Sequence, residues 1–163
     1  MPQLLHGIIN LVTFATSPNL GTSGAQFLKL TADARSAALG SATVATSYGA
    51  NSVFSNPAGV AAITQADVSL SYSRMFSMFD YTSVAVANNF AFGNFAILFT
   101  SFKTDEMEII TEKQPNGTGR KFDAQDFTLG ISYGRFLTNS FSVGATVKYV
   151  EQRIWNEKAA TVA

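Results

Sequence analysis

Large apolar and small polar residues alternate along most of the chain after residue 66. In the stretch 67–73, Val68, Leu70 and Tyr72 occupy one set of alternate positions, and Asp67 and three serines occupy the other. Because successive side chains of a β-strand point to opposite faces of a sheet, this period of two predicts strands. The segments predicted as strands are 67–73, 81–89, 93–111, 122–136 and 140–156, with 41–47 as a candidate sixth.

The polar face of these predicted strands is built from small side chains. In 141–150, the apolar positions run from Phe141 to Tyr149, whereas the opposite positions hold Ser, Gly and Thr residues and Lys148. A soluble β-sandwich would bury its large residues and expose charged ones. Here we expect the large residues to face lipid and the small residues to line a lumen, as in a transmembrane β-barrel. From Phe141 to Tyr149, about 3.3 Å per residue and a tilt near 40° give roughly 20 Å along the barrel axis.

The connections between the predicted strands differ in length. Two are short, 88–94 and 137–140, and two are longer, 74–80 and 112–125. Short turns at one end and long polar loops at the other are typical of an outer-membrane barrel with an up-and-down meander. If the short turns are periplasmic, the strands that begin at 67, 93 and 140 run outward, and the two longer connections are extracellular.

Composition agrees with a membrane-facing sheet and narrows the chemistry. Only 13% of the 163 residues are charged, about half of the ~25% usual for soluble domains. Lys and Arg balance Asp and Glu at 11 each, and this net charge of zero argues against nucleic-acid binding. The chain has no Cys and a single His, His6, which excludes thiolate nucleophiles and almost excludes His-based catalysis or metal ligation. We therefore expect a protein that is not an enzyme and has no cofactor or metal site.

The N-terminal region divides into two parts. Residues 4–15 form an apolar run of the length of a signal-peptide core, too short to span a membrane. We read 1–20 as an export signal or unstructured leader, with an ordinary apolar segment as the alternative. Residues 21–66 are expected on the periplasmic side of the barrel or inside its lumen, where they would form a plug or hatch, whereas 67–163 supplies the barrel strands.

The stretch SVFSNPAGV, 52–60, stands near the end of the predicted plug. Asn56, Pro57 and Gly59 fit the first, second and fourth positions of a type I turn, and Asn56-Pro57 equally fits the N-cap and first residue of a short helix. Neither alternative offers acid–base or nucleophilic chemistry. We interpret this corner as the point where the chain leaves the plug and enters the barrel wall.

Three clusters outside the regular alternation are candidates for function. The carboxylates of 104–112 could bind Ca²⁺ or serve general acid–base chemistry, but a solvated hairpin end is the simpler interpretation. Asp33 and Arg35 fit an ion pair that anchors the plug better than they fit a pair of functional lumenal charges. The apolar loop 74–80 either packs at the membrane interface or binds a partner. The candidate partner-contacting residues in the two longer loops are Met75, Phe76, Met78, Phe79, Glu112, Asn116 and Arg120.

Three short motifs in 21–61 occur together in the order of a known family. They are a Gly followed six residues later by Phe-Leu, an Ala-Arg-x-Ala block that ends at a Gly, and an Asn-Pro-Ala-Gly corner. With this combination the chain resembles, over about residues 20–162, the PorV/PorQ-like outer-membrane proteins, a branch of the FadL-like barrels. The motif residues are Gly21, Phe27, Ala34, Arg35, Gly40, Asn56, Pro57, Ala58 and Gly59.

The resemblance implies a fourteen-stranded barrel in the outer membrane of Gram-negative, Bacteroidetes-type bacteria. It also implies a part in type IX secretion, in which PorV-like proteins receive cargo by its C-terminal signal domain and help deliver it to the cell-surface attachment machinery. The implied partners are outer-membrane lipid, secreted cargo proteins and other components of the secretion system. Five or six strands cannot close such a barrel, so we expect the chain to be the N-terminal part of a longer protein.

Two alternatives to a secretion role stay open on the sequence. A FadL-like barrel would take up hydrophobic small molecules, with such a ligand held in its lumen. A soluble β-domain would bind a lipid-like ligand without entering a membrane. Co-purification with cargo proteins, bound fatty acid without a protein partner, or recovery without detergent would distinguish the three.

Overall fold

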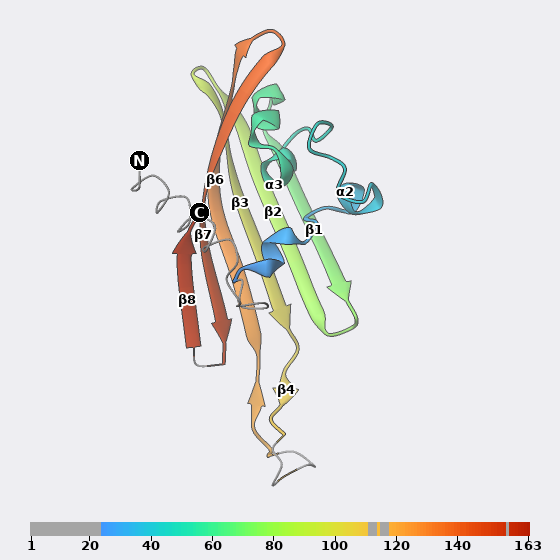
Figure 1. The fold of residues 1–163 in the computed structure, drawn as a ribbon. Coiled ribbons are helices and arrows are strands. Elements are labelled where there is room, and N and C mark those ends of the chain that lie inside the picture. The colour runs from blue at the N-terminus through green and yellow to red at the C-terminus, as the bar shows by residue number, and fades with distance from the viewer. Residues whose placement is uncertain (1–23, 111–113, 115–117, 156) are drawn as a thin grey trace, which may run out of the picture.

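The computed structural model describes residues 24–110, 114, 118–155 and 157–163 and shows an antiparallel sheet with short helices on one face (Figure 1). The strands of the sheet are β1 (Asp67–Met75), β2 (Phe79–Phe90), β3 (Gly93–Thr104), β6 (Ala124–Thr138), β7 (Phe141–Ile154) and β8 (Glu157–Val162). They lie in chain order, so the sheet is an up-and-down meander. A two-stranded ribbon of β4 (Met107–Glu108) and β5 (Lys121–Phe122) extends the β3–β6 connection. The predicted all-β antiparallel class is confirmed.

The connection between β1 and β2 is shorter than predicted. Met75 pairs with Phe79, so these two residues belong to strands and only 76–78 form the turn, which corrects the loop predicted at 74–80. Arg74 and Asp80 pair with each other in the ladder. In the sequence these two charged residues resembled loop residues, but in the structure they extend the pairing of β1 with β2.

The connection between β3 and β6 begins earlier than predicted. β3 ends at Thr104, where the Thr104 hydroxyl accepts a hydrogen bond from the Ala124 N–H at 3.0 Å, and β6 starts at Ala124. The strand predicted at 93–111 therefore divides into β3 and the short β4. The loop predicted at 112–125 is shorter at its C-terminal end, because β5 and the start of β6 lie inside it.

The sixth strand lies at the opposite end of the chain from the predicted one. Residues 41–47 form turns, in which the Thr46 and Ser47 N–H groups donate to the Thr43 carbonyl at 3.0 and 2.8 Å, so the strand predicted there is wrong. The sixth strand is β8, which pairs with the end of β7. Its residues are exposed on both faces, and they accordingly lack the large–small alternation that identified the other strands.

The two faces of the sheet carry the side chains that the alternation predicts. On the inner face, toward the helices, Leu98, Thr128 and Ser132 are almost completely buried. On the outer face, Leu70 is 72% exposed and Ile131 is 58% exposed. Large apolar side chains therefore prevail on the bare face, and mostly small side chains face the helices, with Leu98 among the exceptions. A soluble sheet would instead bury most of its large apolar side chains against the core.

Residues 24–66 pack against the inner face, and we call them the covering segment (Figure 1). Their helices are η1 (Gln26–Lys29), α2 (Ala34–Ala38), α3 (Ser52–Ser55) and η2 (Pro57–Ala62). α2 begins where the Asp33 carboxylate accepts a hydrogen bond from the Ser36 N–H at 2.8 Å, and the chain turns away at Gly40, whose φ of 61° is left-handed. Caps and turns at such close spacing keep every described helix short.

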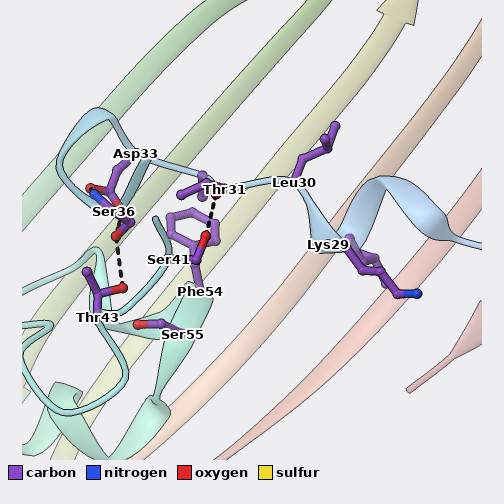
Figure 2. A pocket seen from close by; sticks show the side chains of 11 residues that line it. Lys29, Leu30, Thr31, Asp33, Ser36, Ser41, Thr43, Phe54 and Ser55 are labelled. Atoms are coloured by element: carbon purple, nitrogen blue, oxygen red, sulfur yellow. Dashed lines mark hydrogen bonds between the residues drawn. The ribbon is translucent and has the colours of Figure 1, made fainter. Parts of the chain in front are cut away.

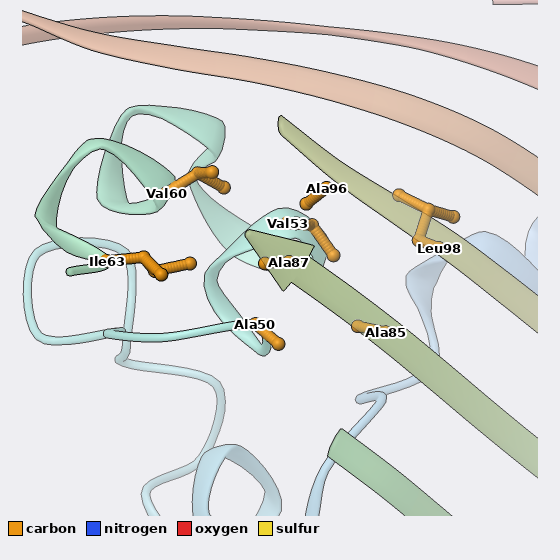
Figure 3. Close-up of a cluster of buried hydrophobic side chains, with 8 residues drawn as sticks. All are labelled: Ala50, Val53, Val60, Ile63, Ala85, Ala87, Ala96 and Leu98. Atoms are coloured by element: carbon orange, nitrogen blue, oxygen red, sulfur yellow. The ribbon is translucent and has the colours of Figure 1, made fainter. Parts of the chain in front are cut away.

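The apolar core lies between the covering segment and strands β2 and β3 (Figure 3). The covering segment contributes branched side chains such as Val53 and Val60, whereas the strands contribute mostly alanines. Small strand residues let the helix backbone approach the sheet closely. The core residues are Ala50, Val53, Val60, Ile63, Ala85, Ala87, Ala96 and Leu98. The leader predicted at 1–20 lies outside the described residues.

Candidate functional site

The Asn-Pro-Ala-Gly corner joins two helices. Asn56 follows α3, and its side-chain oxygen accepts a hydrogen bond from the Ala58 N–H at 3.1 Å, which makes it the N-cap of η2 with Pro57 as the first helical residue. The Asn56 Nδ2 donates to the Val44 carbonyl at 3.0 Å. Of the two predicted geometries, the capped helix start is the one observed. Gly59 is needed for space, because a Cβ there would lie 2.7 Å from the Ser52 Cβ.

The corner rests on two glycines of the sheet. Gly134 of β6 and Gly144 of β7 pair with each other in the ladder. A Cβ on Gly134 would lie 2.9 Å from the Pro57 carbonyl oxygen, and one on Gly144 would lie 2.6 Å from the same atom. These contacts involve backbone, which cannot rotate away as a side chain can. The two glycines therefore form the seat of the corner, a role that sequence reasoning did not assign to them.

A buried amide fixes the end of η2. Asn94 of β3 is 3% exposed, and its Nδ2 donates to the carbonyls of Val60, Ala61 and Ile63 at 2.8, 3.0 and 2.7 Å. Its Oδ1 accepts from the Asn89 Nδ2 at 2.7 Å. One side chain thus satisfies the carbonyl groups that the end of a helix leaves unpaired. The sequence signal was an Asn at an inner position of a strand, where small residues prevail.

Changing Asn94 to Asp should loosen η2 from the sheet. The substitution keeps the shape of the side chain but removes both amide donors and places a carboxylate against three carbonyl oxygens. We expect the free energy of unfolding of the full-length protein in detergent to fall by about 1–3 kcal/mol or more, the cost of buried groups left unpaired. The matched control is Asn88→Asp on the exposed side of β2. Equal melting temperatures for the two variants would show that the Asn94 hydrogen bonds do not hold η2 on the sheet.

Polar side chains of other strands bind the backbone of the covering segment elsewhere. The Gln152 Oε1 accepts from the Ala25 N–H at 2.7 Å, and the Gln152 Nε2 donates to Asp126 at 3.0 Å. The Asp67 carboxylate accepts from the Ala50 N–H at 2.8 Å, and the Ser83 hydroxyl donates to the Ala32 carbonyl. Polar side chains of the sheet therefore hold the backbone of the covering segment at Ala25, Ala32 and Ala50.

Asp33 and Arg35 do not form the predicted ion pair. The Asp33 carboxylate caps α2 and accepts a second hydrogen bond from the Ser36 hydroxyl at 2.6 Å, whereas Arg35 is exposed. The ion pairs found among the described residues do not include one between Asp33 and Arg35. An Asp one residue before a short helix is more useful as its cap than as a counterion.

The remaining motif residues have structural positions in the covering segment. Phe27 is buried and anchors η1, Ala34 is the exposed first residue of α2, and Gly40 follows its C-terminal end. Gly21 lies outside the described residues. The described motif residues thus mark the helix ends and contacts of the covering segment, and none of them presents a reactive group to a cavity.

A pocket of about 180 Å³ opens within the covering segment (Figure 2). Its hydroxyl groups form hydrogen bonds with neighbouring side chains. The Thr31 and Ser41 hydroxyl oxygens lie 2.8 Å apart. The Ser36 hydroxyl donates to the Asp33 carboxylate at 2.6 Å, and the Thr43 hydroxyl donates to the Ser36 hydroxyl oxygen at 3.1 Å. These groups already have partners, so the pocket offers a ligand few free donors or acceptors.

The β1–β2 turn presents an aromatic side chain to solvent. Phe76 is 88% exposed, and both Phe76 and Ser77 have left-handed φ angles, of 52° and 60°. The Arg74 Nη2 donates to the Ser77 carbonyl at 2.9 Å and to the Asp105 carboxylate at 2.8 Å. Non-glycine residues are uncommon in this conformation, and the Arg74 contacts hold the turn in place. Met78 is also exposed, whereas Met75 and Phe79 are half-buried strand residues.

Arg120 lies at the same end of the sheet. Its guanidinium is 5.4 Å from the centre of the Trp155 ring, a cation–π contact that joins the β4–β5 ribbon to the end of β7. Glu112 and Asn116, the other residues predicted to contact a partner, lie outside the described residues. Three of the residues predicted to contact a partner lie in connections between the strands of the sheet, namely Phe76, Met78 and Arg120.

The outer face is apolar in its middle and charged at one end. One row of paired residues across the sheet is Val68, Val86, Ile97, Ile131 and Val147. A row six residues farther along β6 is Arg74, Asp80, Lys103, Gln125, Arg153 and Lys158. At the opposite end, Arg135 occupies an outer position. From Arg135 to Gln125, ten residues at about 3.3 Å and a tilt near 40° give roughly 25 Å, the height of the apolar band on a membrane barrel.

The described residues offer contacts and surfaces rather than a reaction centre. They contain no group of three or more His, Cys, Asp or Glu side chains that could hold a metal ion. None of the helices in the described part of the chain is long and apolar enough to cross a membrane. The features that stand out are the bare apolar face, the covered polar face and the braced turn at Phe76.

Comparison with known proteins identifies a family. The family described as "Type IX secretion system protein PorV" matches residues 15–161, which is most of the chain. No curated protein and no solved structure matches. The matched range includes the covering segment and nearly the whole sheet, and the resemblance drawn from the three motifs is confirmed. The chain belongs to the family of the type IX secretion system protein PorV.

Proposed function

We propose that the chain forms a wall and plug of an outer-membrane β-barrel that serves type IX secretion without catalysing a reaction. Its family associates it with that secretion system. The observation that supports a membrane wall is the distribution of side chains on the sheet. The bare face carries mostly large apolar side chains between charged ends roughly 25 Å apart, with Thr82, Ser101 and Glu151 as polar side chains inside this interval. The face covered by residues 24–66 carries mostly small side chains.

The proposal includes further strands that pair with β1 and β8, the two edges of the sheet. Backbone N–H and C=O groups in hydrocarbon need hydrogen-bond partners, so an edge strand cannot face lipid unpaired. A closed barrel satisfies both edges and turns the polar face into a lumen. Outer-membrane lipid then covers the apolar row that includes Ile97, Ile131 and Val147.

In this arrangement the covering segment is the plug. Its Asn56–Gly59 corner rests on Gly134 and Gly144, close to the β6–β7 hairpin, so it closes the end of the barrel that carries the short turns. We assign that end to the periplasm, because the long β3–β6 connection lies at the other end and long loops are extracellular in outer-membrane barrels. The turn at Phe76 and the β4–β5 ribbon then lie on the cell surface.

We assign the contact with secretion partners to the turn at Phe76. The charged row with Arg74 and Asp80 separates this turn from the apolar band, which favours contact with protein over burial in lipid. The exposed aromatic ring on a braced turn is the kind of side chain that anchors protein interfaces. Cargo proteins and other components of the secretion system are the proposed partners.

Phe76→Ala should reduce delivery of cargo to the cell surface and leave the amount of this protein in the outer membrane unchanged. The ring contacts little within the chain, so its loss affects an interface and not the fold. Phe92→Ala is the matched control, since Phe92 is exposed on the β2–β3 hairpin at the other end of the sheet. Surface-bound cargo is measured by labelling of intact cells, and equal values for the two variants would contradict the assignment.

The secretion role itself is tested by deleting the gene in its host. Cargo with the type IX C-terminal signal domain should then fail to reach the surface, and the full-length gene should restore delivery. Normal cargo delivery in the deletion strain would rule the role out. Normal delivery combined with lost uptake of fatty acids would favour the uptake channel, which stays a prediction from the sequence.

A further inference from the structure

A small cavity of about 30 Å³ lies between the covering segment and the inner face of the sheet. The covering segment closes it with residues that include Leu30 and Phe54. The sheet contributes Tyr81, Leu98, Thr100, Thr128 and Lys148 to its lining. A cavity holds a water-sized particle once its volume exceeds about 10–15 Å³. The cavity is therefore large enough for one or two small particles and too small for an organic ligand.

Two hydroxyl groups in this cavity have no hydrogen-bond partner among the described residues. Thr100 of β3 and Thr128 of β6 face each other in the ladder, and they are 4% and 0% exposed. Neither Oγ1 makes a hydrogen bond with another described group. Because buried hydroxyls in proteins are nearly always hydrogen-bonded, two adjacent ones without partners indicate a bound particle between them.

Lys148 adds a positive charge to the same cavity. It is the one cation on the inner face of the sheet's described strands, and no ion pair of the described residues involves it. Its stem crosses Gly130, where an added Cβ would lie 3.1 Å from the Lys148 Cγ. Gly130 thus leaves the space that lets the lysine side chain lie along the sheet toward the two threonines.

We propose that Lys148, Thr100 and Thr128 bind one small monovalent anion of the halide class beneath the covering segment. Both hydroxyls donate a hydrogen bond to the anion, and the ammonium group balances its charge. A water molecule would satisfy the hydroxyls but leave the cation without a counterion. This site goes beyond the proposed secretion role and does not depend on it.

Bromide replaces chloride and scatters anomalously, so crystals of the full-length protein grown in sodium bromide test the site directly. The expected result is an anomalous peak in contact with the Lys148 ammonium and both threonine hydroxyls. The peak should disappear in Lys148→Met. A cavity that holds only water, or a peak that persists in Lys148→Met as an adventitious ion only, would overturn the proposal.

A solution measurement provides an independent readout. At constant ionic strength, replacing gluconate with chloride or bromide should raise the melting temperature of the detergent-solubilised full-length protein. The rise should be absent in Lys148→Met and smaller in Thr100→Val. It should be retained in Lys103→Met, which removes the same charge from the exposed outer face. An equal halide response in Lys148→Met and Lys103→Met would refute the site.

Discussion

Gly144→Ala should displace the Asn56–Gly59 corner from the sheet. The added methyl group would lie 2.6 Å from the Pro57 carbonyl oxygen, and both the strand and the helix start are backbone at this contact. Neither can move without disturbing the ladder or the Asn56 cap. Forcing a group into a filled space typically costs about 1–3 kcal/mol, so we expect a lower melting temperature for the full-length protein in detergent.

The same variant should also expose the corner to protease, because the covering segment loses its seat. Gly134→Ala should have a smaller effect in the same direction, since its methyl group would lie 2.9 Å from the same oxygen. Ala145→Val is the control, because it adds two methyl groups at the next position of β7, on the exposed face. A Gly144→Ala protein as stable and protease-resistant as Ala145→Val would show that the corner does not rest on this glycine.

Ile131→Arg should prevent stable assembly of the protein in the membrane. Ile131 lies on the outer face near the middle of β6 and is 58% exposed. An arginine on the lipid face near the midplane of a barrel costs about 2–4 kcal/mol, whereas the cost near the interface is about 0–1 kcal/mol. On a soluble sheet, the same exposed substitution would change the stability by about 0.5 kcal/mol or less.

Gln125→Arg provides the matched control on the same strand. Gln125 lies in the charged row that includes Arg74 and Lys103, where an additional arginine meets water and headgroups. Each full-length variant is folded into lipid vesicles, and titration with denaturant then gives its free energy of unfolding. Equal stability of the two variants would exclude the membrane wall and favour the soluble β-domain.

The strands and their faces follow from the sequence because one physical rule produces them. Large side chains on the bare outer face alternate with small ones that face the covering segment, as Leu129 and Ile131 alternate with Thr128 and Gly130. The alternation is clearest in β6 and weaker in β2 and β3, where Tyr81 and Leu98 lie on the inner face. It fails for β8, whose residues are exposed on both faces, and it misled at 41–47, where small residues alternate in a segment that turns.

The contacts of the covering segment could not be predicted in the same way. Gly134 and Gly144 are ordinary small residues of a polar face until Pro57, far away in sequence, is placed on them. Asn94 likewise becomes a helix clamp only when η2 is placed against β3. Asp33 and Arg35 carry opposite charges two residues apart, which suggested an ion pair. The Asp33 carboxylate instead accepts the Ser36 N–H at the start of α2, a local contact that the sequence did not distinguish from an ion pair.

The orientation of the sheet can be measured with spin labels, and these 163 residues contain no cysteine that would compete for the label. Single cysteines introduced along 142–149 of β7 in the full-length protein carry spin labels, and their collision rates with oxygen and with a water-soluble relaxing agent are measured in lipid vesicles. Labels at 143, 145, 147 and 149 should be accessible to oxygen dissolved in lipid, and labels at 142, 144, 146 and 148 should not. Oxygen accessibility without this alternation, or highest at the even positions, would contradict a sheet that faces lipid with its large residues and the covering segment with its small ones.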